Sequence, residues 1–308
     1  MLGGLKRMKF LACIQALCPE LEIRQGVALE KYTTLRVGGP ADYFAEPKTE
    51  EEIMLVLQAA KDCDLPVLLI GNGSNLLIRD GGFRGLVIRL GKNFSRIEKI
   101  ENGLYAQAGA LMSQLAHAAL EAEYTGLEFA QGIPGAVGGG VYMNAGAYGG
   151  EMCQVVSAVR ILVKGKIVEI PAAEMEFSYR HTKAMDENWL ILGAYFQLKK
   201  GDPAEIGALM RDLASRRKEK QPLEYPSAGS FFKRPTGYFA GALIEQSGLK
   251  GFTVGGAQVS EKHAGFLINV GGATASDFIE LKEKIQQIVM EKFGVHMENE
   301  VRILGNDL

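Results

Sequence analysis

Apolar residues recur at helical spacing in several stretches of the chain, with polar residues between them. This periodicity predicts amphipathic helices that each bury one face. Thr49 stands where it can cap one of these helices, and Glu52 occupies the capping-box position. The helices are expected at residues 1–21, 49–63, 111–122, 202–220, 239–247 and 274–293. Their inward-facing residues are expected to include Leu17, Leu111 and Leu209.

Shorter apolar runs bounded by Gly, Pro, Asn or Asp predict strands. Lys164-Gly165 separates two such runs and predicts a hairpin, whereas residues 225–235 read as a loop. The strands are expected at residues 66–70, 76–78, 86–90, 95–100, 104–108, 155–163, 166–170, 189–198, 252–257, 266–270, 295–297 and 300–304, and another ends at 44–47. The mixed order predicts an α+β protein with an N-terminal helix at 1–21, a small α/β domain at 22–90, a second domain at 91–207 and a C-terminal α+β domain at 208–308.

The sequence LLIGNGSNLLIRD at residues 68–80 places a glycine-rich turn between two apolar runs. Gly71 and Gly73 can adopt φ > 0, and such a turn exposes backbone N–H groups that can form a nest for phosphate or pyrophosphate. A plain hairpin turn is the alternative, because Asn-Gly is a common hairpin signal. The sequence contains no Walker A loop, and Leu76 stands where a G-x-G-x-x-G motif needs its third Gly.

Residues 126–150 are rich in glycine, and almost none of them is charged. Flexible Gly-rich linkers carry Ser, Glu and Lys, whereas this segment carries Ile133, Val137, Val141 and two tyrosines. We therefore expect its backbone to pack against something flat or bulky. A large planar cofactor is one candidate, and a close-packed corner of a sheet is the other.

Charge and cysteine usage exclude several classes of function. The net charge of −2 over 308 residues argues against electrostatic binding to nucleic acid or to an anionic membrane. The four cysteines form no C-x-x-C pair and only four histidines accompany them, so no metal site is expected. No apolar run is long enough to span a membrane. Free thiols are typical of a reducing compartment, and we expect a cytoplasmic protein.

Three residues far apart in the sequence are candidates for chemistry. Arg180 offers a planar fork that matches a carboxylate. Ser230 lies between a glycine and two phenylalanines, where its hydroxyl can donate a proton, although no Asp/His pair makes it a nucleophile. Glu300 stands near a predicted strand edge. Each of these residues taken singly is equally consistent with a surface or structural role, and His263 reads as a loop or core histidine.

Taken together, the motifs resemble those of UDP-N-acetylenolpyruvoylglucosamine reductase, the flavoenzyme family that makes UDP-N-acetylmuramate for bacterial peptidoglycan. The resemblance runs from about residue 22 to residue 304. It is carried by YTTLRVGGPA at 32–41, GNGSNLLIRD at 71–80, GIPGAVGGGVYMNAGAYGGE at 132–151, SYRHT at 178–182, PSAGSFFKRP at 226–235 and ENEVRILG at 298–305.

The resemblance implies a two-subdomain FAD-binding region of the vanillyl-alcohol-oxidase type, followed by a C-terminal substrate-binding domain. It implies FAD held without a covalent bond and NADPH as the second substrate. The matched catalytic residues are Arg180, Ser230 and Glu300. The implied cofactor-binding residues are Tyr32, Thr33, Thr34, Arg36, Gly71, Asn72, Gly73, Ser74, Asn75, Leu76, Gly132, Ile133, Pro134, Gly135, Gly138, Gly139, Asn144, Ala145 and Gly146.

For the substrate, UDP-N-acetylglucosamine-enolpyruvate, the resemblance implies Tyr179 as a contact. Lys218 or Lys220, together with Lys233 or Arg234, is expected to meet its diphosphate. Longer members of the family insert a substrate-covering tyrosine loop between the matched Arg and Ser, and this chain has no such insertion. It therefore resembles the shorter subtype, and a monomer is expected.

Two rival interpretations stay open at this stage. A flavin oxidase or dehydrogenase of the same fold often tethers its flavin through His or Cys, and Cys153 lies close to the Gly-rich segment. A flavin-binding or nucleotide-sugar-binding regulator without turnover is the other rival. The presence of Arg180, Ser230 and Glu300 argues against a regulator of this kind.

Overall fold

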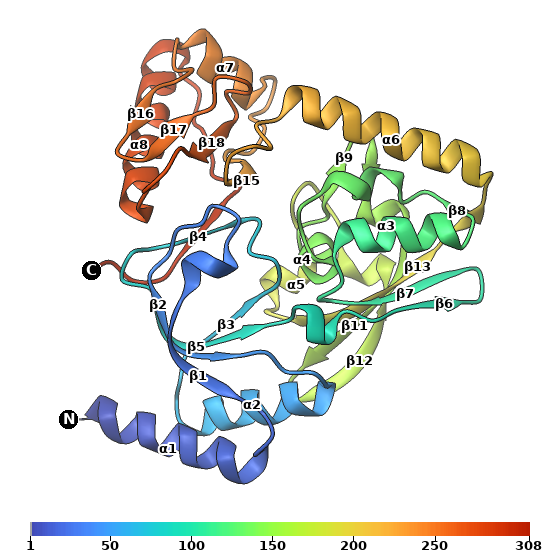
Figure 1. The fold of residues 1–308 in the computed structure, drawn as a ribbon, viewed down its shortest axis with the longest axis vertical. Coiled ribbons are helices and arrows are strands. Elements are labelled where there is room, and N and C mark those ends of the chain that lie inside the picture. The colour runs from blue at the N-terminus through green and yellow to red at the C-terminus, as the bar shows by residue number, and fades with distance from the viewer. Residues whose placement is uncertain (1) are drawn as a thin grey trace. The chain divides into compact units, whose positions relative to one another are not determined.

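The computed structural model describes residues 2–308, with side chains described from residue 9 onward. The chain divides into two compact units. The first unit comprises residues 1–24, 43–72 and 85–216, and the second comprises residues 25–42, 73–84 and 217–308. Figure 1 shows the elements of both units, coloured along the chain. Each unit thus gathers segments that are distant in sequence.

Two N-terminal helices pack together in the first unit: α1 (Leu2–Leu17) and α2 (Glu50–Asp62). The predicted cap of α2 is confirmed, because Thr49 Oγ1 accepts a hydrogen bond from Glu52 N at 3.1 Å. The Glu52 carboxylate accepts its own bond from Lys48 N at 2.6 Å rather than from Thr49 N. The predicted inward face of α1 is partly wrong, because Leu17 is 44% exposed. The chain instead buries Phe10, Ile14, Cys18 and Leu21.

Two larger sheets lie within residues 23–197. The first has the strand order β1-β2-β5-β3 and the second has the antiparallel order β12-β11-β13-β7-β6. In the first, β3 runs parallel to β5, with Val67 opposite Leu86. These strands are β1 (Ile23–Ala28), β2 (Pro40–Ala45), β3 (Val67–Ile70), β5 (Phe83–Arg89), β6 (Ile97–Ile100), β7 (Gly103–Gln107), β11 (Val156–Val163), β12 (Lys166–Pro171) and β13 (Leu190–Gln197). The predicted hairpin is confirmed: Lys164 and Gly165, both with φ > 0, join β11 to β12.

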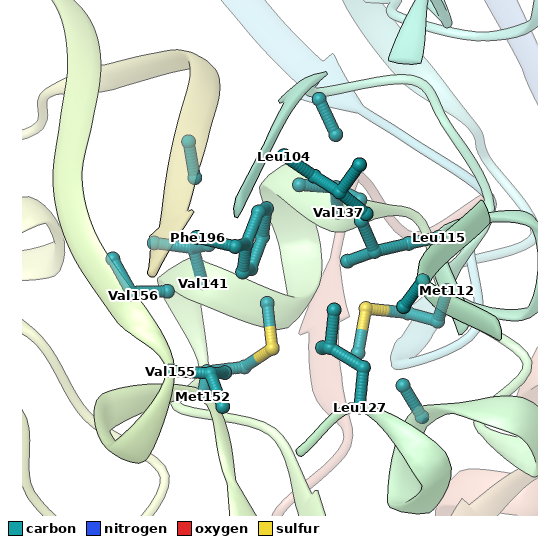
Figure 2. Close-up of a cluster of buried hydrophobic side chains, with 14 of the residues drawn as sticks. Leu104, Met112, Leu115, Leu127, Val137, Val141, Met152, Val155, Val156 and Phe196 are labelled. Carbon is teal, nitrogen blue, oxygen red and sulfur yellow. The ribbon is translucent and has the colours of Figure 1, made fainter. Parts of the chain in front are cut away.

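Helices α3 (Met112–Glu121), α4 (Val137–Tyr142) and α6 (Pro203–Lys220) complete the core around the second sheet. Figure 2 shows Val137 and Val141 of α4 in the same buried cluster as Leu115 and Phe196. Helix α4 was not predicted, because its sequence VGGGVY lacks helix-favouring residues. The predicted inward positions Leu111 and Leu209 are wrong: they are 37% and 45% exposed. The buried residues of these helices include Met112, Ala116, Ile206 and Met210.

The second unit has its own core, built around stacked phenylalanines. Phe231 and Phe278 lie parallel at 6.5 Å between ring centroids, and both are fully buried. A four-stranded sheet of order β15-β18-β17-β16 packs with α7 and α8, while β4 and β19 pair in parallel. These elements are β4 (Leu76–Ile78), β15 (Ser227–Ser230), α7 (Ala240–Gln246), β16 (Thr253–Val254), β17 (Ala257–Val259), β18 (Phe266–Asn269), α8 (Ala275–Phe293) and β19 (Arg302–Leu304).

Three sequence expectations for this unit are corrected. The expected loop at 225–235 contains β15, which pairs with β18. The expected strand at 252–257 is two strands, because Gly255, with φ +52°, and Gly256 turn the chain between them. Residues 295–297 form no strand.

Several short elements connect the main ones. They are η1 (Leu29–Tyr32), η2 (Lys92–Phe94), β8 (Tyr124–Thr125), η3 (Glu128–Gly132), β9 (Gly146–Ala147), β10 (Gly150–Glu151), η4 (Met152–Gln154), η5 (Ala172–Met175), α5 (Lys183–Asp186) and β14 (Lys199–Lys200). Within residues 2–308, no helix is long and apolar enough to cross a membrane. The described side chains also form no group of three or more His, Cys, Asp and Glu suited to a metal ion.

Candidate functional site

The glycine-rich turn after β3 is not a hairpin. Strand β3 pairs with β5, whereas β4, which follows the turn, pairs with β19. Gly73 has φ +62°, and a Cβ built on it would lie 2.0 Å from the carbonyl oxygen of Tyr32. The Gly73 carbonyl in turn accepts a hydrogen bond from Thr34 N at 3.2 Å. Residue 73 therefore has to be glycine, because the backbone of residue 32 approaches it closely.

Thr34 also carries an unsatisfied polar atom. Its hydroxyl oxygen is buried and has no hydrogen-bond partner among the described residues. A buried hydroxyl without a partner costs free energy, so native proteins rarely leave one uncompensated. This orphaned atom beside Gly73 fits a position at which a bound ligand completes the hydrogen bonding.

The first residues of the turn meet the Gly-rich segment within the first unit. Asn72 Nδ2 donates to the Pro134 carbonyl at 2.6 Å, and a Cβ on Gly71 would lie 3.2 Å from Ala136 Cβ. Both segments line one cavity of about 150 Å³. Two segments that were expected to hold the same cofactor are thus brought together.

Sequence reasoning missed other residues that line this cavity: Arg89, Gly91, Lys92, Ser95, Gly109 and Gln114. A signal for the first of them was present. Strands β3 and β5 are parallel neighbours, so their carboxyl ends share one edge of the sheet, where open α/β sheets bind ligands. Arg89 closes β5 and pairs with Glu46 at 3.0 Å.

The glycines of α4 divide between the two explanations that the sequence left open. A Cβ on Gly138 would lie 2.7 Å from Ala108 Cβ, and one on Gly140 would lie 2.8 Å from Met112 Sδ. These two glycines are required by packing within the protein. A Cβ on Gly139 would meet nothing within 4 Å, and this residue is exposed. Only Gly139 in this helix leaves room on an open face where a ligand can approach.

Arg180 lies in a tight turn at the surface of the first unit. Ser178 and His181 exchange two backbone hydrogen bonds, and Arg180 between them has φ +56°. Its guanidinium lies 5.1 Å from the centre of the Tyr179 ring. It also donates to the carbonyls of Asn144 and Gly146, each at 3.4 Å. The Gly-rich segment and the predicted catalytic Arg are therefore in direct contact.

In the second unit, the backbone of Glu300 is bonded to the residue that follows Ser230. The carbonyl of Phe231, the residue after Ser230, accepts a hydrogen bond from Glu300 N at 2.9 Å. Asn75, in the glycine-rich turn, donates through Nδ2 to the Glu300 carbonyl at 3.1 Å. Ser230 is exposed, while Phe231 and Phe232 beside it are buried and fix the backbone.

His263 lies in the loop between β17 and β18, where its contacts are structural. Its Nδ1 accepts a hydrogen bond from Gly265 N at 3.1 Å, and its ring meets Phe266 edge-on at 4.9 Å. Burial lowers the pKa of His263, which keeps the ring neutral and its Nδ1 available as an acceptor. This agrees with the expected loop or core histidine.

The predicted diphosphate ligands differ in their surroundings. Lys233 Nζ pairs with Glu298 at 2.5 Å, so a carboxylate already offsets its charge. The Arg234 guanidinium lies 3.9 Å from the centre of the Phe239 ring, which is 62% exposed. Lys218 and Lys220 are exposed on the last turn of α6.

The remaining predicted cofactor residues occupy less distinctive positions. Thr33 is buried and donates through its hydroxyl to the Val37 carbonyl at 2.8 Å. Arg36 has φ +56° and is exposed. Ser74 follows Gly73, and Leu76 begins β4 opposite Arg302. The others, Tyr32, Gly132, Ile133, Gly135 and Ala145, lie at the ends of η1, η3 and α4 or just beyond them.

Two protein-family models match this chain. Residues 41–171 match the FAD binding domain family, and residues 221–304 match the C-terminal domain of UDP-N-acetylenolpyruvoylglucosamine reductase. A glucooligosaccharide oxidase from Acremonium strictum shares the fold at 13% identity, with a TM-score of 0.50 over 94% of this chain and 60% of the oxidase. The chain is an FAD-binding oxidoreductase with the α+β fold of the vanillyl-alcohol-oxidase type.

More similar proteins narrow this class. The UDP-N-acetylenolpyruvoylglucosamine reductase of Pediococcus pentosaceus is 49% identical over 94% of this chain and 96% of its own length. That of Clostridioides difficile is 50% identical over 93% and 94%. The crystal structure of the Thermus caldophilus enzyme has a TM-score of 0.79 at 36% identity, covering 92% of this chain and 98% of that one. The chain belongs to the UDP-N-acetylenolpyruvoylglucosamine reductase family. The sequence predictions of this family, of the α+β fold and of FAD as cofactor are confirmed.

Proposed function

We propose that the chain reduces UDP-N-acetylglucosamine-enolpyruvate to UDP-N-acetylmuramate, a peptidoglycan precursor, with NADPH as the source of electrons. Family membership supports reduction of an enolpyruvyl group on a UDP-sugar. The observation that carries the proposal is the backbone hydrogen bond from Glu300 N to the Phe231 carbonyl, because it joins Glu300 to the residue that follows Ser230.

The residues fit FAD held without a covalent bond. The turn around Gly73 and the orphaned Thr34 hydroxyl suit the pyrophosphate, whose oxygens accept hydrogen bonds. The open face at Gly139 suits a flat ring, because no side chain covers the backbone there. Residues 22–207 would hold the cofactor, and residues 208–308 would bind the UDP-sugar.

Reduction adds a hydride to C3 of the enolpyruvyl group and a proton to C2. When bound, FAD that NADPH has reduced supplies the hydride. Negative charge then develops at C2 and on the conjugated carboxylate, and Arg180 stabilises it electrostatically. Ser230 donates the proton from its hydroxyl to C2, and Glu300 orients the groups that bind the carboxylate.

The diphosphate is the remaining charged part of the substrate. We take Arg234, Lys218 and Lys220 as candidate ligands of the diphosphate, and Lys233 would have to exchange its ion pair with Glu298 to join them. Arg also offers a fork that matches phosphate oxygens.

Stopped-flow absorbance of the bound flavin tests the proposal. Mixing the purified holoprotein with NADPH should bleach the oxidised flavin band, and adding UDP-N-acetylglucosamine-enolpyruvate without oxygen should restore it. Acid precipitation should release all the flavin, whereas an oxidase with a tethered flavin would retain it in the pellet. Reduced flavin that the enolpyruvyl substrate does not reoxidise would overturn the proposal.

A further inference from the structure

Asn144 is a buried junction between three segments of the first unit. It follows α4, is 2% exposed and has φ +42°. Its Nδ2 donates to Glu151 Oε2 and to the Ser178 carbonyl, each at 3.1 Å. Its Oδ1 accepts from Cys153 N at 3.0 Å. Both N–H donors of the carboxamide are therefore engaged within the protein, which leaves none for a cofactor.

Two of the contacts around Asn144 lead to Arg180. The Asn144 backbone carbonyl accepts a hydrogen bond from the Arg180 guanidinium at 3.4 Å. Its carboxamide holds the carbonyl of Ser178, the first residue of the turn that carries Arg180. Asn144 thus contacts the turn at its base and the side chain at its charged end.

The turn needs such support because its backbone is strained. Arg180 occupies the third position of a four-residue turn with φ +56°, where glycine is favoured. A left-handed backbone is unfavourable for a residue with a side chain, because Cβ then crowds the carbonyl oxygen that follows. Strain of this kind persists only where neighbouring contacts hold it, and it gathers at functional sites.

We propose that Asn144 is a positioning residue that sets the turn and the guanidinium of Arg180 for the reaction. Glu151 is the second member of this device, because its carboxylate fixes the carboxamide orientation that leaves Nδ2 facing Ser178. The inference rests on the proposed role of Arg180. It assigns the Asn144 side chain to the protein itself, instead of the cofactor contact that the sequence motif implied.

A near-isosteric change isolates this role. Asn144→Asp keeps the shape and the acceptor for Cys153 N, but it replaces both donors with an acceptor that faces the Glu151 carboxylate. A displacement of about 1 Å can cost on the order of 10²-fold in rate. We therefore expect flavin reoxidation by the enolpyruvyl substrate to slow by about 10–100-fold. Flavin reduction by NADPH should stay close to the wild-type rate.

A double-mutant cycle separates positioning from general loss of structure. Asn144→Asp is measured alone and in an Arg180→Lys background, which keeps the charge and removes the fork. If Asn144 acts through Arg180, its substitution should slow reoxidation much less in the second background, since coupled residues are not additive. Ser157→Ala is the matched control: it removes the bond from Ser157 Oγ to the Tyr195 carbonyl and should lower Tm without changing either rate.

The outcomes distinguish two failures. An Arg180→Lys variant that reoxidises at the wild-type rate would refute the proposed role of Arg180. If Arg180→Lys reoxidises slowly and Asn144→Asp causes the same fold-loss in both backgrounds, the positioning role of Asn144 is refuted while the role of Arg180 stands. If Asn144→Asp does not fold, Glu151→Gln replaces it in the cycle. Glu151→Gln should slow reoxidation less than expected for Asn144→Asp, and this loss should also shrink in the Arg180→Lys background.

Discussion

Gly139→Ala is expected to stabilise the flavin-free protein and to lower its affinity for FAD. Residue 139 lies inside α4, where glycine costs about 0.5–1 kcal/mol relative to alanine. The added methyl group would meet nothing within 4 Å. The free energy of unfolding of the flavin-free protein should therefore rise by about that amount.

The effect on the cofactor should have the opposite sign. If the flavin lies against this face, the methyl group forces the two apart, and such overpacking typically costs about 1–3 kcal/mol. Since about 1.4 kcal/mol is tenfold in affinity, the dissociation constant of FAD should rise about 5–150-fold. Gly138→Ala is the control with the opposite expectation: its methyl group would meet Ala108 Cβ at 2.7 Å and should destabilise the flavin-free protein.

Two measurements check this pair. Urea unfolding of the flavin-free protein gives the change in stability, and quenching of flavin fluorescence in a titration gives the FAD dissociation constant. A Gly139→Ala protein that is as stable as expected and binds FAD with wild-type affinity would show that the cofactor does not approach this face of α4.

Two further predictions concern the second unit. Gly73→Ala should destabilise this unit by about 2–5 kcal/mol in urea unfolding. The left-handed backbone contributes about 1–2 kcal/mol and the clash with the Tyr32 carbonyl about 1–3 kcal/mol. A loss below about 1 kcal/mol would contradict the 2.0 Å approach. Burial raises the pKa of Asp80, but hydrogen bonds from Ser276 Oγ, Ala275 N and Ser276 N outweigh burial and hold that pKa below the usual value of an Asp carboxyl. A carboxyl group whose pKa is lowered on folding stabilises above its unfolded pKa, so Asp80→Asn should cost about 1–2 kcal/mol at pH 7, and the gap from wild type should narrow as the pH falls below about 4. Denaturant unfolding at a series of pH values checks this, and a gap that is constant down to pH 2 would contradict it.

Local signals in the sequence predicted those parts of the fold that depend on neighbouring residues. Thr49 caps α2 and Lys164-Gly165 turns the β11–β12 hairpin, because caps and tight turns need only adjacent groups. Helix α4 escaped prediction, because three consecutive glycines disfavour a helix locally. It forms because Val137 and Val141 are buried in the core and the small glycines let it approach Ala108 and Met112.

For the candidate site, too, local features were predictable from the sequence and contacts between distant residues were not. The glycine-rich turn was recognisable from its sequence, but its strand pairing, which excludes a hairpin, depended on β5 and β19. The carboxamide of Asn144 gave no sequence signal of its true partners, because Glu151, Cys153 and Ser178 meet it only in the folded chain. Sequence motifs thus indicated which segments matter, while the partner of each side chain required the structure.

The rate at which substrate reoxidises the reduced flavin in Ser230→Ala tests the central claim most directly. The variant should be reduced by NADPH at the wild-type rate, since that step needs no proton from Ser230. Reoxidation by UDP-N-acetylglucosamine-enolpyruvate should be slower by about 10²–10⁴-fold, the usual contribution of a general acid. Ser227→Ala, on the same strand, should leave both rates unchanged. Reoxidation of Ser230→Ala at the wild-type rate would contradict the account, because the proton would then come from another group.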